Sequence, residues 1–458
     1  GGSVSSLMVF TRDLRVDDNP ALSAAGNQGP LSCLFVMDDK FVNSHRGSPR
    51  RQTFLLQSLT DLDTSLKQLG AHLEVVRGCW LQEVQGRARE LGATSIHVSE
   101  DYSFYAQQRL NSLETWCQDN SVVLHKHPGI TVVPPEHIQP SGGGEYKVFT
   151  PYWRAWLSAP KRALVDTPTS LRGVSQQHRN CSFPSSDLSA AAPMGGESHG
   201  RHHLQKWLNS ELSNYVDKRD HPGMDVTSKL SPYLHFGCIS PLRLVELADG
   251  IPGSESFVRQ VAWRDFFAQI LNAHPTASWQ DYRHRGDVWS YDAQVYNSWV
   301  TGSTGFPLVD AGMRQLNAEG FMPNRVRMVT ASFLVKDLHQ DWRLGADYFM
   351  SQLIDGDIAS NYLNWQWVAG TGTDSNPHRI LNPTTQAKRF DGDGLYIKRW
   401  VPELSALPPT QALNPPLATR QDIGYPPPIV DHHHQVELFK QRRLSANPFG
   451  NTPNNSAN

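Results

Sequence analysis

The stretch LIDGDIASNYLNWQW at residues 353–367 decides how the rest of this sequence is interpreted. Taken alone, its Asp-Gly-Asp core is typical of a simple turn or a cation-binding loop. The stretch lies in a region, from about His203 to Glu403, where strand patterns are absent and apolar residues recur at helical spacing. This half of the chain is therefore expected to be a helical domain. The helical periods cover residues 204–215, 242–248, 255–273, 306–318, 324–338 and 346–354.

The N-terminal part, up to about Pro128, has a different pattern, in which short β-branched or apolar runs alternate with amphipathic stretches. This alternation predicts an α/β fold with a doubly wound parallel sheet, which often binds a ligand where its strand order switches. No GxGxxG follows the first strand, so a conventional dinucleotide site in this half is not expected. The expected strands are residues 7–10, 32–37, 72–76 and 95–98, and the expected helices are 50–69 and 80–91.

Composition between and after these two halves sets the domain boundaries. Residues 131–205 are rich in Gly, Ser and Pro and are interpreted as a linker that wraps over the surface, with one helix near residues 152–159. The α/β domain is placed at residues 5–130 and the helical domain at 206–404. Residues 405–458 are expected to be a loose tail with one short helix near residues 436–443.

Charge and cysteine content narrow the class of protein. The 458 residues carry a net charge of -2, so binding to a nucleic acid would depend on local basic patches. The five cysteines are far apart and lack CxxC spacing, so neither a disulfide framework nor a metal site is expected. No apolar run approaches the roughly 20 residues of a membrane-spanning helix. We expect a reducing compartment, the cytoplasm of a bacterium or the nucleus or an organelle of a eukaryote, and no secretion.

Further motifs surround residues 353–367. They are TRDLR at 11–15 with DDNP at 17–20, TSKLSPYL at 227–234, WRDF at 263–266, NRVRM at 324–328 and NPTTQ at 382–386. Together the motifs resemble the DNA photolyase and cryptochrome family, and most of all the class I cyclobutane pyrimidine dimer photolyases. The resemblance covers nearly all of residues 6–404. It implies an N-terminal antenna domain and a C-terminal helical domain that binds FAD.

The resemblance also implies which residues bind FAD. Asp355, Gly356 and Asp357 would line the ribityl, adenine and isoalloxazine side, although Asp355 could simply pair with Arg327. Asn361 would face flavin N5, where a neutral amide can accept from a protonated nitrogen; plant cryptochromes typically have Asp there and animal ones Cys. Hydroxyl and backbone donors at a helix start suit a diphosphate, although they also serve as helix caps. The phosphate-binding set is Tyr215, Thr227, Ser228, Lys229, Leu230 and Ser231.

Thirteen tryptophans are a high number for this chain, and many lie between Trp263 and Trp400. A cluster of aromatic residues is often just a large core. By resemblance, however, Trp289, Trp342 and Trp365 match a relay that carries an electron from the protein surface to FAD. Indole is readily oxidised, so three spaced indoles would divide one long transfer into short steps.

An out-turned pyrimidine dimer needs an apolar stacking wall and polar groups for its carbonyl edges. By resemblance, Trp263 and Trp367 form the wall, Asn324 and Met328 line the pocket, and Gln260 donates to a dimer carbonyl. Many dimer-splitting photolyases carry Glu at the position of Gln260, whereas (6-4) photolyases and animal cryptochromes usually carry Gln. Phosphate-side contacts would come from Arg219, Arg264, Arg325, Arg379 and Gln386, although surface arginines are often merely solvated.

Residues 322–325, MPNR, lack the histidine that (6-4) photolyases need. The resemblance therefore implies repair of cyclobutane dimers in UV-damaged DNA by a monomer. The main alternative is a cryptochrome photoreceptor, and a (6-4) photolyase is a weaker one. A dark FAD-dependent oxidoreductase has little support, because no nicotinamide fingerprint is present. An antenna chromophore, methenyltetrahydrofolate or 8-hydroxy-5-deazaflavin, would bind near residues 100–103, Arg51 and residues 35–40, unless that cleft is vacant.

Overall fold

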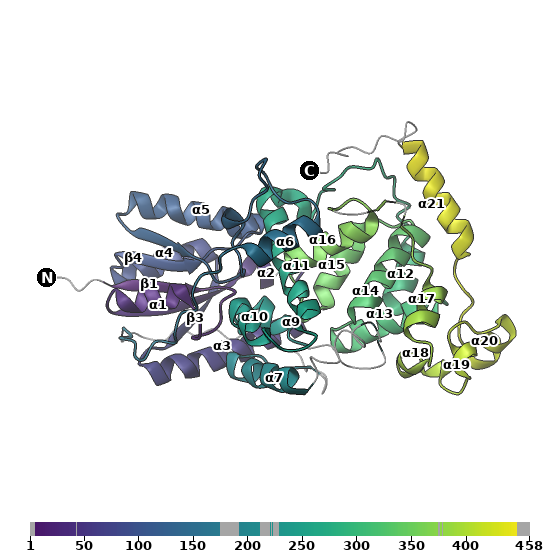
Figure 1. Ribbon diagram of the computed structural model, residues 1–458, viewed down its shortest axis with the longest axis horizontal. Coiled ribbons are helices and arrows are strands. Elements are labelled where there is room, and N and C mark those ends of the chain that lie inside the picture. Colours follow the sequence, from purple (N-terminus) through teal and green to yellow (C-terminus); the bar gives the residue numbers. More distant parts are fainter. Residues whose placement is uncertain are drawn as a thin grey trace.

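The structure is a computed structural model that describes residues 5–42, 44–174, 192–210, 220, 222, 229–373, 376–377 and 379–446. An α/β part and a helical part lie side by side along the long axis of the molecule (Figure 1). Among the described residues, no helix is both long enough and apolar enough to cross a membrane.

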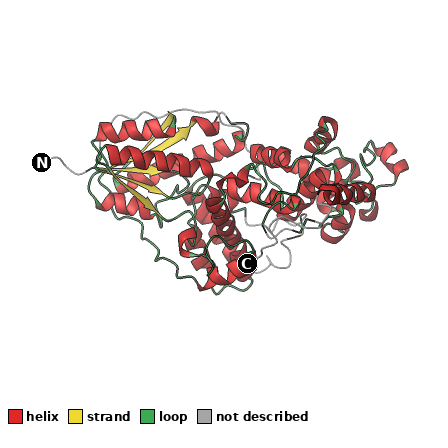
Figure 2. Ribbon diagram, turned by 90° about the horizontal axis from the view of Figure 1, so that it is seen from above, coloured by secondary structure: helices red, strands yellow, loops and turns green. Residues whose placement is uncertain are grey.

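The N-terminal part is built on a five-stranded parallel sheet with the order β3-β2-β1-β4-β5. Helices cover the sheet on both sides (Figure 2), so the predicted doubly wound parallel sheet is confirmed. The strand β5, in which His and Lys interrupt the apolar run, was not predicted. The strands are β1 (Ser6–Phe10), β2 (Leu31–Asp38), β3 (Leu73–Gly78), β4 (Ser95–Ser99) and β5 (Val123–His127). The helices are α1 (Pro20–Asn27), α2 (Asp39–Val42), α3 (Pro49–Leu69), α4 (Trp80–Leu91) and α5 (Phe104–Asp119).

Local sequence signals explain where two of these helices begin and end. The Asn19 side chain accepts a hydrogen bond from the Leu22 amide, and Pro20 occupies the first turn of α1. Ser48 caps α3 in the same way, and Gly70, at a φ of 102°, ends it in the left-handed conformation. Both helices are therefore fixed by residues close in sequence.

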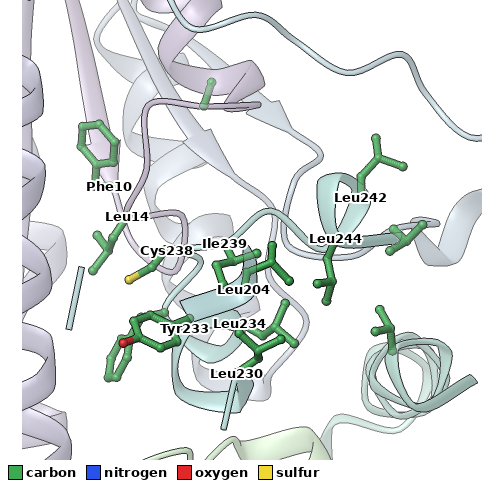
Figure 3. Packing of buried hydrophobic residues seen from close by; sticks show 14 of the residues in the cluster. Phe10, Leu14, Leu204, Leu230, Tyr233, Leu234, Cys238, Ile239, Leu242 and Leu244 are labelled. Atoms are coloured by element: carbon green, nitrogen blue, oxygen red, sulfur yellow. The ribbon is translucent and has the colours of Figure 1, made fainter. Parts of the chain in front are cut away.

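The sheet separates two hydrophobic clusters because successive side chains of a strand point to opposite faces. Leu7 and Val9 pack with α4 and α5, whereas Met8 and Phe10 pack on the other face with α3. The cluster that contains Met8 and Phe10 continues into the helical part, where it includes Tyr233. Figure 3 shows Phe10, Leu14, Tyr233 and Cys238 in this shared core. The two halves therefore share one core cluster rather than meeting only through a linker.

The segment after β5 runs back over the α/β part. It contains the short η1 helix (Pro135–His137) and α6 (Phe149–Ser158), which agrees with the single helix predicted near residues 152–159. Its end returns to the sheet, where the amides of Leu31 and Val174 bond to the carbonyls of Arg172 and Leu31. This part of the linker is thus anchored to the fold.

From residue 192 onward, the described residues form helices and turns and contain no strand, which confirms the predicted helical half. Residues 324–338, predicted as one helix, form α14 followed by a π-helical turn. The elements are α7 (Glu197–Ser210), α9 (Ser231–His235), α10 (Pro241–Ala248), α11 (Ser254–Ala273), η3 (Pro275–Ser278), α12 (Ala293–Thr301), α13 (Pro307–Glu319), α14 (Asn324–Ser332), η4 (Phe333–Asp337), α15 (Trp342–Gln352), α16 (Ile358–Ala369), α17 (Pro383–Phe390), α18 (Leu395–Trp400) and η5 (Pro402–Leu404).

The short helix predicted near residues 436–443 is present within a longer helix, but the rest of residues 405–446 differs from the loose tail that the sequence predicts. They form α19 (Pro409–Ala412), α20 (Leu417–Ile423) and α21 (His432–Ala446). Tyr425, Phe439 and Arg443 are buried against the helical domain. Arg443 bonds to Asp287, with its Nε and Nη2 at 2.8 Å and 2.9 Å from the two carboxylate oxygens. The Pro- and His-rich composition suggested a tail, but these long-range contacts hold the segment in place.

Candidate functional site

A cavity of about 410 Å³ lies among α9, α11, α14 and α16. Its volume falls within the usual range of small-molecule sites, roughly 300–1,000 Å³. The cavity brings together residues from four of the sequence motifs. Twelve of the predicted site residues line it: Lys229, Ser231, Gln260, Trp263, Arg264, Asn324, Met328, Asp355, Asp357, Asn361, Trp365 and Trp367. Tyr215, Arg219, Thr227 and Ser228 lie outside the described residues.

The loop before α16 fixes the charged edge of this cavity. Asp357 caps α16 by accepting from the Ser360 amide at 2.9 Å. It also accepts from Arg12 Nη2 at 2.6 Å and lies 3.2 Å from His235 Nδ1. Burial alone would raise the pKa of Asp357, but the Arg12 charge and the His235 contact outweigh it and hold the pKa well below its usual range. Asp357 is therefore an ionised carboxylate at neutral pH.

The two residues that precede Asp357, Asp355 and Gly356, mainly stabilise the structure around the cavity. Asp355 accepts from Arg327 Nη2 at 3.1 Å, so the simple ion pair considered from the sequence is present. Gly356 allows Arg51 to approach, because a Cβ on Gly356 would lie 2.6 Å from Arg51 Nη1. Arg51 Nη1 in turn donates to the Met350 and Leu353 carbonyls. The glycine of the Asp-Gly-Asp motif thus leaves room for Arg51 of α3 to bond to the helical domain at the cavity edge.

Asn361 is well placed to present an acceptor to the cavity. Its side chain is buried, and Nδ2 donates to the Ala346 carbonyl at 2.9 Å. A carbonyl can only accept, so this bond determines which end of the amide carries the nitrogen. The amide oxygen is left as the end that can accept from an N–H group in the cavity.

The three tryptophans of the predicted relay belong to one hydrophobic cluster. Trp365 lines the cavity and is buried, Trp342 is fully buried, and Trp289 packs on the same cluster but is partly exposed. Trp342 Nε1 donates to Asp281 at 2.8 Å. The series therefore runs from the cavity wall through the core to the surface. Trp299, which the sequence analysis did not single out, packs edge-on against Trp365, with ring centroids 5.9 Å apart.

The residues predicted for a flipped base lie on the other walls of the same cavity. Trp263 stacks on Phe149, with ring centroids 3.8 Å apart and an interplanar angle of 6°. Trp367 lies beneath the Arg379 guanidinium, 5.1 Å from the ring centroid. Gln260 is exposed one turn before Trp263 on α11. Two indole rings and an amide thus border one open space.

The other predicted phosphate contacts are placed differently. Arg264 lies in the cavity lining and donates to the Leu234 carbonyl at 3.3 Å, whereas its buried Nη1 has no hydrogen-bond partner among the described residues. Arg325 lies outside that lining; it pairs with Asp220 at 3.5 Å and stacks on Phe390. Gln386 is half-buried on α17 and also lies outside the lining. Membership of a motif therefore did not predict whether a side chain faces the cavity.

A second cavity of about 450 Å³ lies at the carboxyl ends of the strands, where β1 separates the β2 and β4 sides of the sheet. Of the residues predicted for an antenna chromophore, Arg51, Phe35–Asp38, Lys40 and Asp101–Ser103 line it, whereas Asp39 and Glu100 do not. Its polar end holds Asp38, which accepts from Tyr105 at 2.5 Å and Arg109 at 3.3 Å. His235, Arg264 and Asp357 line both cavities and form the wall between them.

Arg12 and His235 are the main site residues without a predicted role. Arg12 bridges the two halves, because it donates to Asp101 in one and to Asp357 in the other. Burial lowers the pKa of His235 to about 4 despite its contact with Asp357. Arg12 stood within the TRDLR motif, which was a usable signal. His235 follows the TSKLSPYL motif directly, but nothing in the sequence brings it to Asp357.

Comparison with known proteins agrees with this architecture. Residues 6–170 match the family model described as DNA photolyase, and residues 257–444 match the FAD binding domain of DNA photolyase. A deoxyribodipyrimidine photo-lyase from Streptomyces griseus is 43% identical over 453 residues, covering 96% of this chain and 99% of that protein.

Two solved structures have the same fold. A bacterial class III photolyase from Agrobacterium tumefaciens is similar with a TM-score of 0.88 and 31% identity, over 98% of both chains. A Synechocystis sp. PCC6803 cryptochrome is similar with a TM-score of 0.90 and 28% identity, over 96% of this chain and 99% of that one. The sequence relationship spans nearly the whole chain and includes both domain models, so this chain belongs to the DNA photolyase family.

Proposed function

We propose that this protein uses light to split cyclobutane pyrimidine dimers in UV-damaged DNA. The observation that carries the proposal is a single cavity that joins Asp357 and Asn361 on one side to Trp263 and Trp367 on another. When bound, FAD supplies the light absorption and the electron that opens the dimer. The protein holds cofactor and lesion in one space.

The cavity lining fits FAD. The diphosphate is anionic, and the buried Arg264 Nη1, which lacks a partner among the described residues, supplies a cationic donor. Ser231 lies in the lining at the start of α9 and supplies a hydroxyl. The Asn361 amide oxygen, left free to accept by the bond from Nδ2 to Ala346, would take a hydrogen bond from flavin N5. Together these residues bind and orient the cofactor at the inner end of the cavity.

We further propose that Trp289, Trp342 and Trp365 pass an electron inward to the cavity. Support comes from their graded burial within one cluster, with Trp365 at the cavity and Trp289 nearest to solvent. Trp342→Phe should abolish photoreduction of oxidised FAD, because phenylalanine is much harder to oxidise than indole. Photoreduction is followed by absorbance under blue light, with FAD content measured beside it. Unchanged photoreduction in the variant would contradict the relay.

Trp263 and Trp367 are proposed to stack on the out-turned dimer, with Gln260 donating to a carbonyl. Trp263 is held by its stack on Phe149, so the wall is already in place. Base–aromatic stacking contributes about 1–3 kcal/mol, so Trp263→Ala should weaken binding of dimer-containing DNA by about tenfold or more. FAD retention should change little. Trp400→Ala, at a partly buried tryptophan outside the cavity, is the matched control. Equal loss of FAD and DNA binding would argue against the stacking role.

Similarity to a cryptochrome makes signalling the alternative to repair. The deciding experiment is blue-light repair of a cyclobutane thymine dimer in a defined oligonucleotide, with pre-reduced, FAD-loaded protein and a dark control. Light-dependent return of thymine absorbance supports the proposal. No repair by protein with photoreducible FAD favours a cryptochrome, and repair of a (6-4) product would overturn the choice of substrate.

The second cavity is proposed to hold an antenna chromophore, methenyltetrahydrofolate or 8-hydroxy-5-deazaflavin. Its position at the strand switch point and its mixed lining support a planar, partly polar ligand. The absorption spectrum of protein reconstituted with each compound separates the two. We expect one of them to bind in a ratio of about one per chain, and Phe35→Arg to prevent that binding by filling the cavity with a charged side chain. Binding of neither compound would contradict the proposal.

A further inference from the structure

Tyr291 has an unusual backbone conformation next to the outer end of the relay. Its φ is 49°, in the left-handed region that bulky residues rarely adopt, and His339 opposite it has a φ of 56°. The two segments are tied together, because the Ser290 amide bonds to the His339 carbonyl at 2.9 Å and the Asp292 amide to Gln340 Oε1 at 3.0 Å. Such strain persists only where surrounding contacts enforce it, and it concentrates at functional sites.

The strained pairing places the Tyr291 phenol on a carboxylate. The hydroxyl donates to Asp341 Oδ2 at 2.9 Å. The other oxygen, Oδ1, accepts from the Arg343 amide and from Arg343 Nη1, both at 3.0 Å. Oδ1 is therefore occupied by the helix cap and the guanidinium, whereas Oδ2 faces the phenol. Partial burial and the Asp341 carboxylate raise the pKa of Tyr291, so the phenol keeps its proton at neutral pH.

Each residue of this pair is close in sequence to a member of the relay. Tyr291 follows Trp289 by two residues, so their Cα atoms are at most about 7 Å apart. Asp341 directly precedes Trp342, the first residue of α15. Tyr291 is 62% exposed, so a reductant in solution can reach it. The geometry thus combines an accessible phenol, a proton acceptor and a neighbouring indole.

We propose that Tyr291, with Asp341 as proton acceptor, is the last internal electron donor and re-reduces oxidised Trp289. The proposal rests on the tryptophan relay of the proposed function. One electron passes from the phenol to the Trp289 radical cation, which returns to neutral indole. The O–H bond breaks, and its proton moves to Asp341 Oδ2, leaving a neutral tyrosyl radical. A thiol in solution then gives a hydrogen atom to the phenoxyl oxygen and becomes a thiyl radical, while Asp341 releases its proton to water.

A carboxylate next to the phenol matters because an oxidised phenol is a strong acid. Transfer of the electron and the proton together avoids a charged tyrosyl cation, which would otherwise lie beside Arg343. Asp341→Asn tests this step selectively. Asparagine keeps one oxygen that can still cap α15, but the position that faces the phenol becomes an NH2 group, which cannot take the phenol's proton. Tyr291→Phe removes the donor itself.

The test is flash photolysis of the FAD-loaded full chain with oxidised flavin, combined with electron paramagnetic resonance of samples frozen after the flash. In the wild type, the tryptophan radical should decay as a tyrosyl signal appears. In Tyr291→Phe and in Asp341→Asn, the tyrosyl signal should be lost and the tryptophan radical should persist several-fold longer. Photoreduction with dithiothreitol should slow accordingly. FAD content and melting temperature show whether each variant is folded.

Tyr425→Phe is the matched control, because Tyr425 donates to the Asp310 carboxylate at 2.5 Å but is buried away from solvent. It should keep both radical signals. An unchanged tyrosyl signal in Tyr291→Phe, or an unchanged tryptophan-radical lifetime, would overturn the proposal. Absence of any tryptophan radical in the wild type would instead refute the tryptophan relay itself. Trp342→Phe shows what that failure looks like, because it blocks electron transfer before Trp289 is oxidised.

Discussion

Gly345 provides a direct test of how tightly the inner tryptophan is packed. It lies inside α15, where its missing side chain makes room for Trp365. A Cβ at this position would lie 2.2 Å from Trp365 Cη2, 2.5 Å from Trp365 Cζ3 and 2.6 Å from Leu334 Cδ2. Trp365 is confined on another side by Phe349, with ring centroids 4.9 Å apart. Gly345→Ala therefore forces the indole or the helix to move.

The magnitude follows from two opposing effects. Alanine in place of glycine inside a helix stabilises it by about 1 kcal/mol. Overpacking a core typically costs about 1–3 kcal/mol, and three contacts far inside van der Waals distance place this site at the upper end. The expected net result is a loss of about 2 kcal/mol of unfolding free energy. Photoreduction of FAD should also slow, because Trp365 is displaced from its position at the cavity.

Gly86→Ala is the matched control, since Gly86 lies inside α4 and a Cβ there would meet nothing within 4 Å. It should stabilise the protein by up to about 1 kcal/mol. Urea unfolding of each variant beside the wild type, followed by circular dichroism and FAD fluorescence, measures the change in unfolding free energy. Absorbance under blue light measures the rate of photoreduction. If Gly345→Ala were as stabilising as Gly86→Ala and left photoreduction unchanged, the argument that Trp365 is immobilised against α15 would be wrong.

Two other variants test long-range contacts. Arg443→Met leaves the buried Asp287 carboxylate without the partner that donates two hydrogen bonds to it, which should lower the unfolding free energy in urea by about 3–5 kcal/mol. Adding Asp287→Leu should restore part of that loss. No restoration would contradict the pairing. Burial, followed by the charges of His127 and His125, lowers the pKa of His97 to about 3 from its ordinary 6.5. Protonation therefore favours the unfolded chain, so stability is complete above pH 6.5 and is lost as the pH falls below it. Between about pH 7.5 and about pH 5.5, His97 should account for about 1.4 kcal/mol of lost stability, and unfolding at both pH values should show a weaker dependence in His97→Gln.

Part of the architecture could be predicted from residues that are close in sequence. The runs at β1 and β2, the cap at Asn19 and the helical periods around α11 depend on neighbours within a few positions, because side chains repeat every two residues in a strand and every three to four in a helix. The resemblance likewise identified twelve of the residues that line the cavity proposed to bind FAD. Resemblance carried these assignments, and the geometry then brought twelve of them together.

Contacts between distant residues could not be predicted in this way. Arg12 and Asp357 are 345 positions apart, and Tyr291 meets Asp341 across 50 positions, so nothing in the local pattern fixes either pair. The same limit explains why Arg264 lies in the wall between two cavities and why α21 is anchored by Arg443 instead of forming a loose tail. The amino-acid sequence by itself determined the fold class and the family, because both follow from local periodicity and ordered motifs. Only the tertiary structure decided which charges pair, which tryptophans share a core and which phenol meets a carboxylate, because those contacts form only when the chain closes on itself.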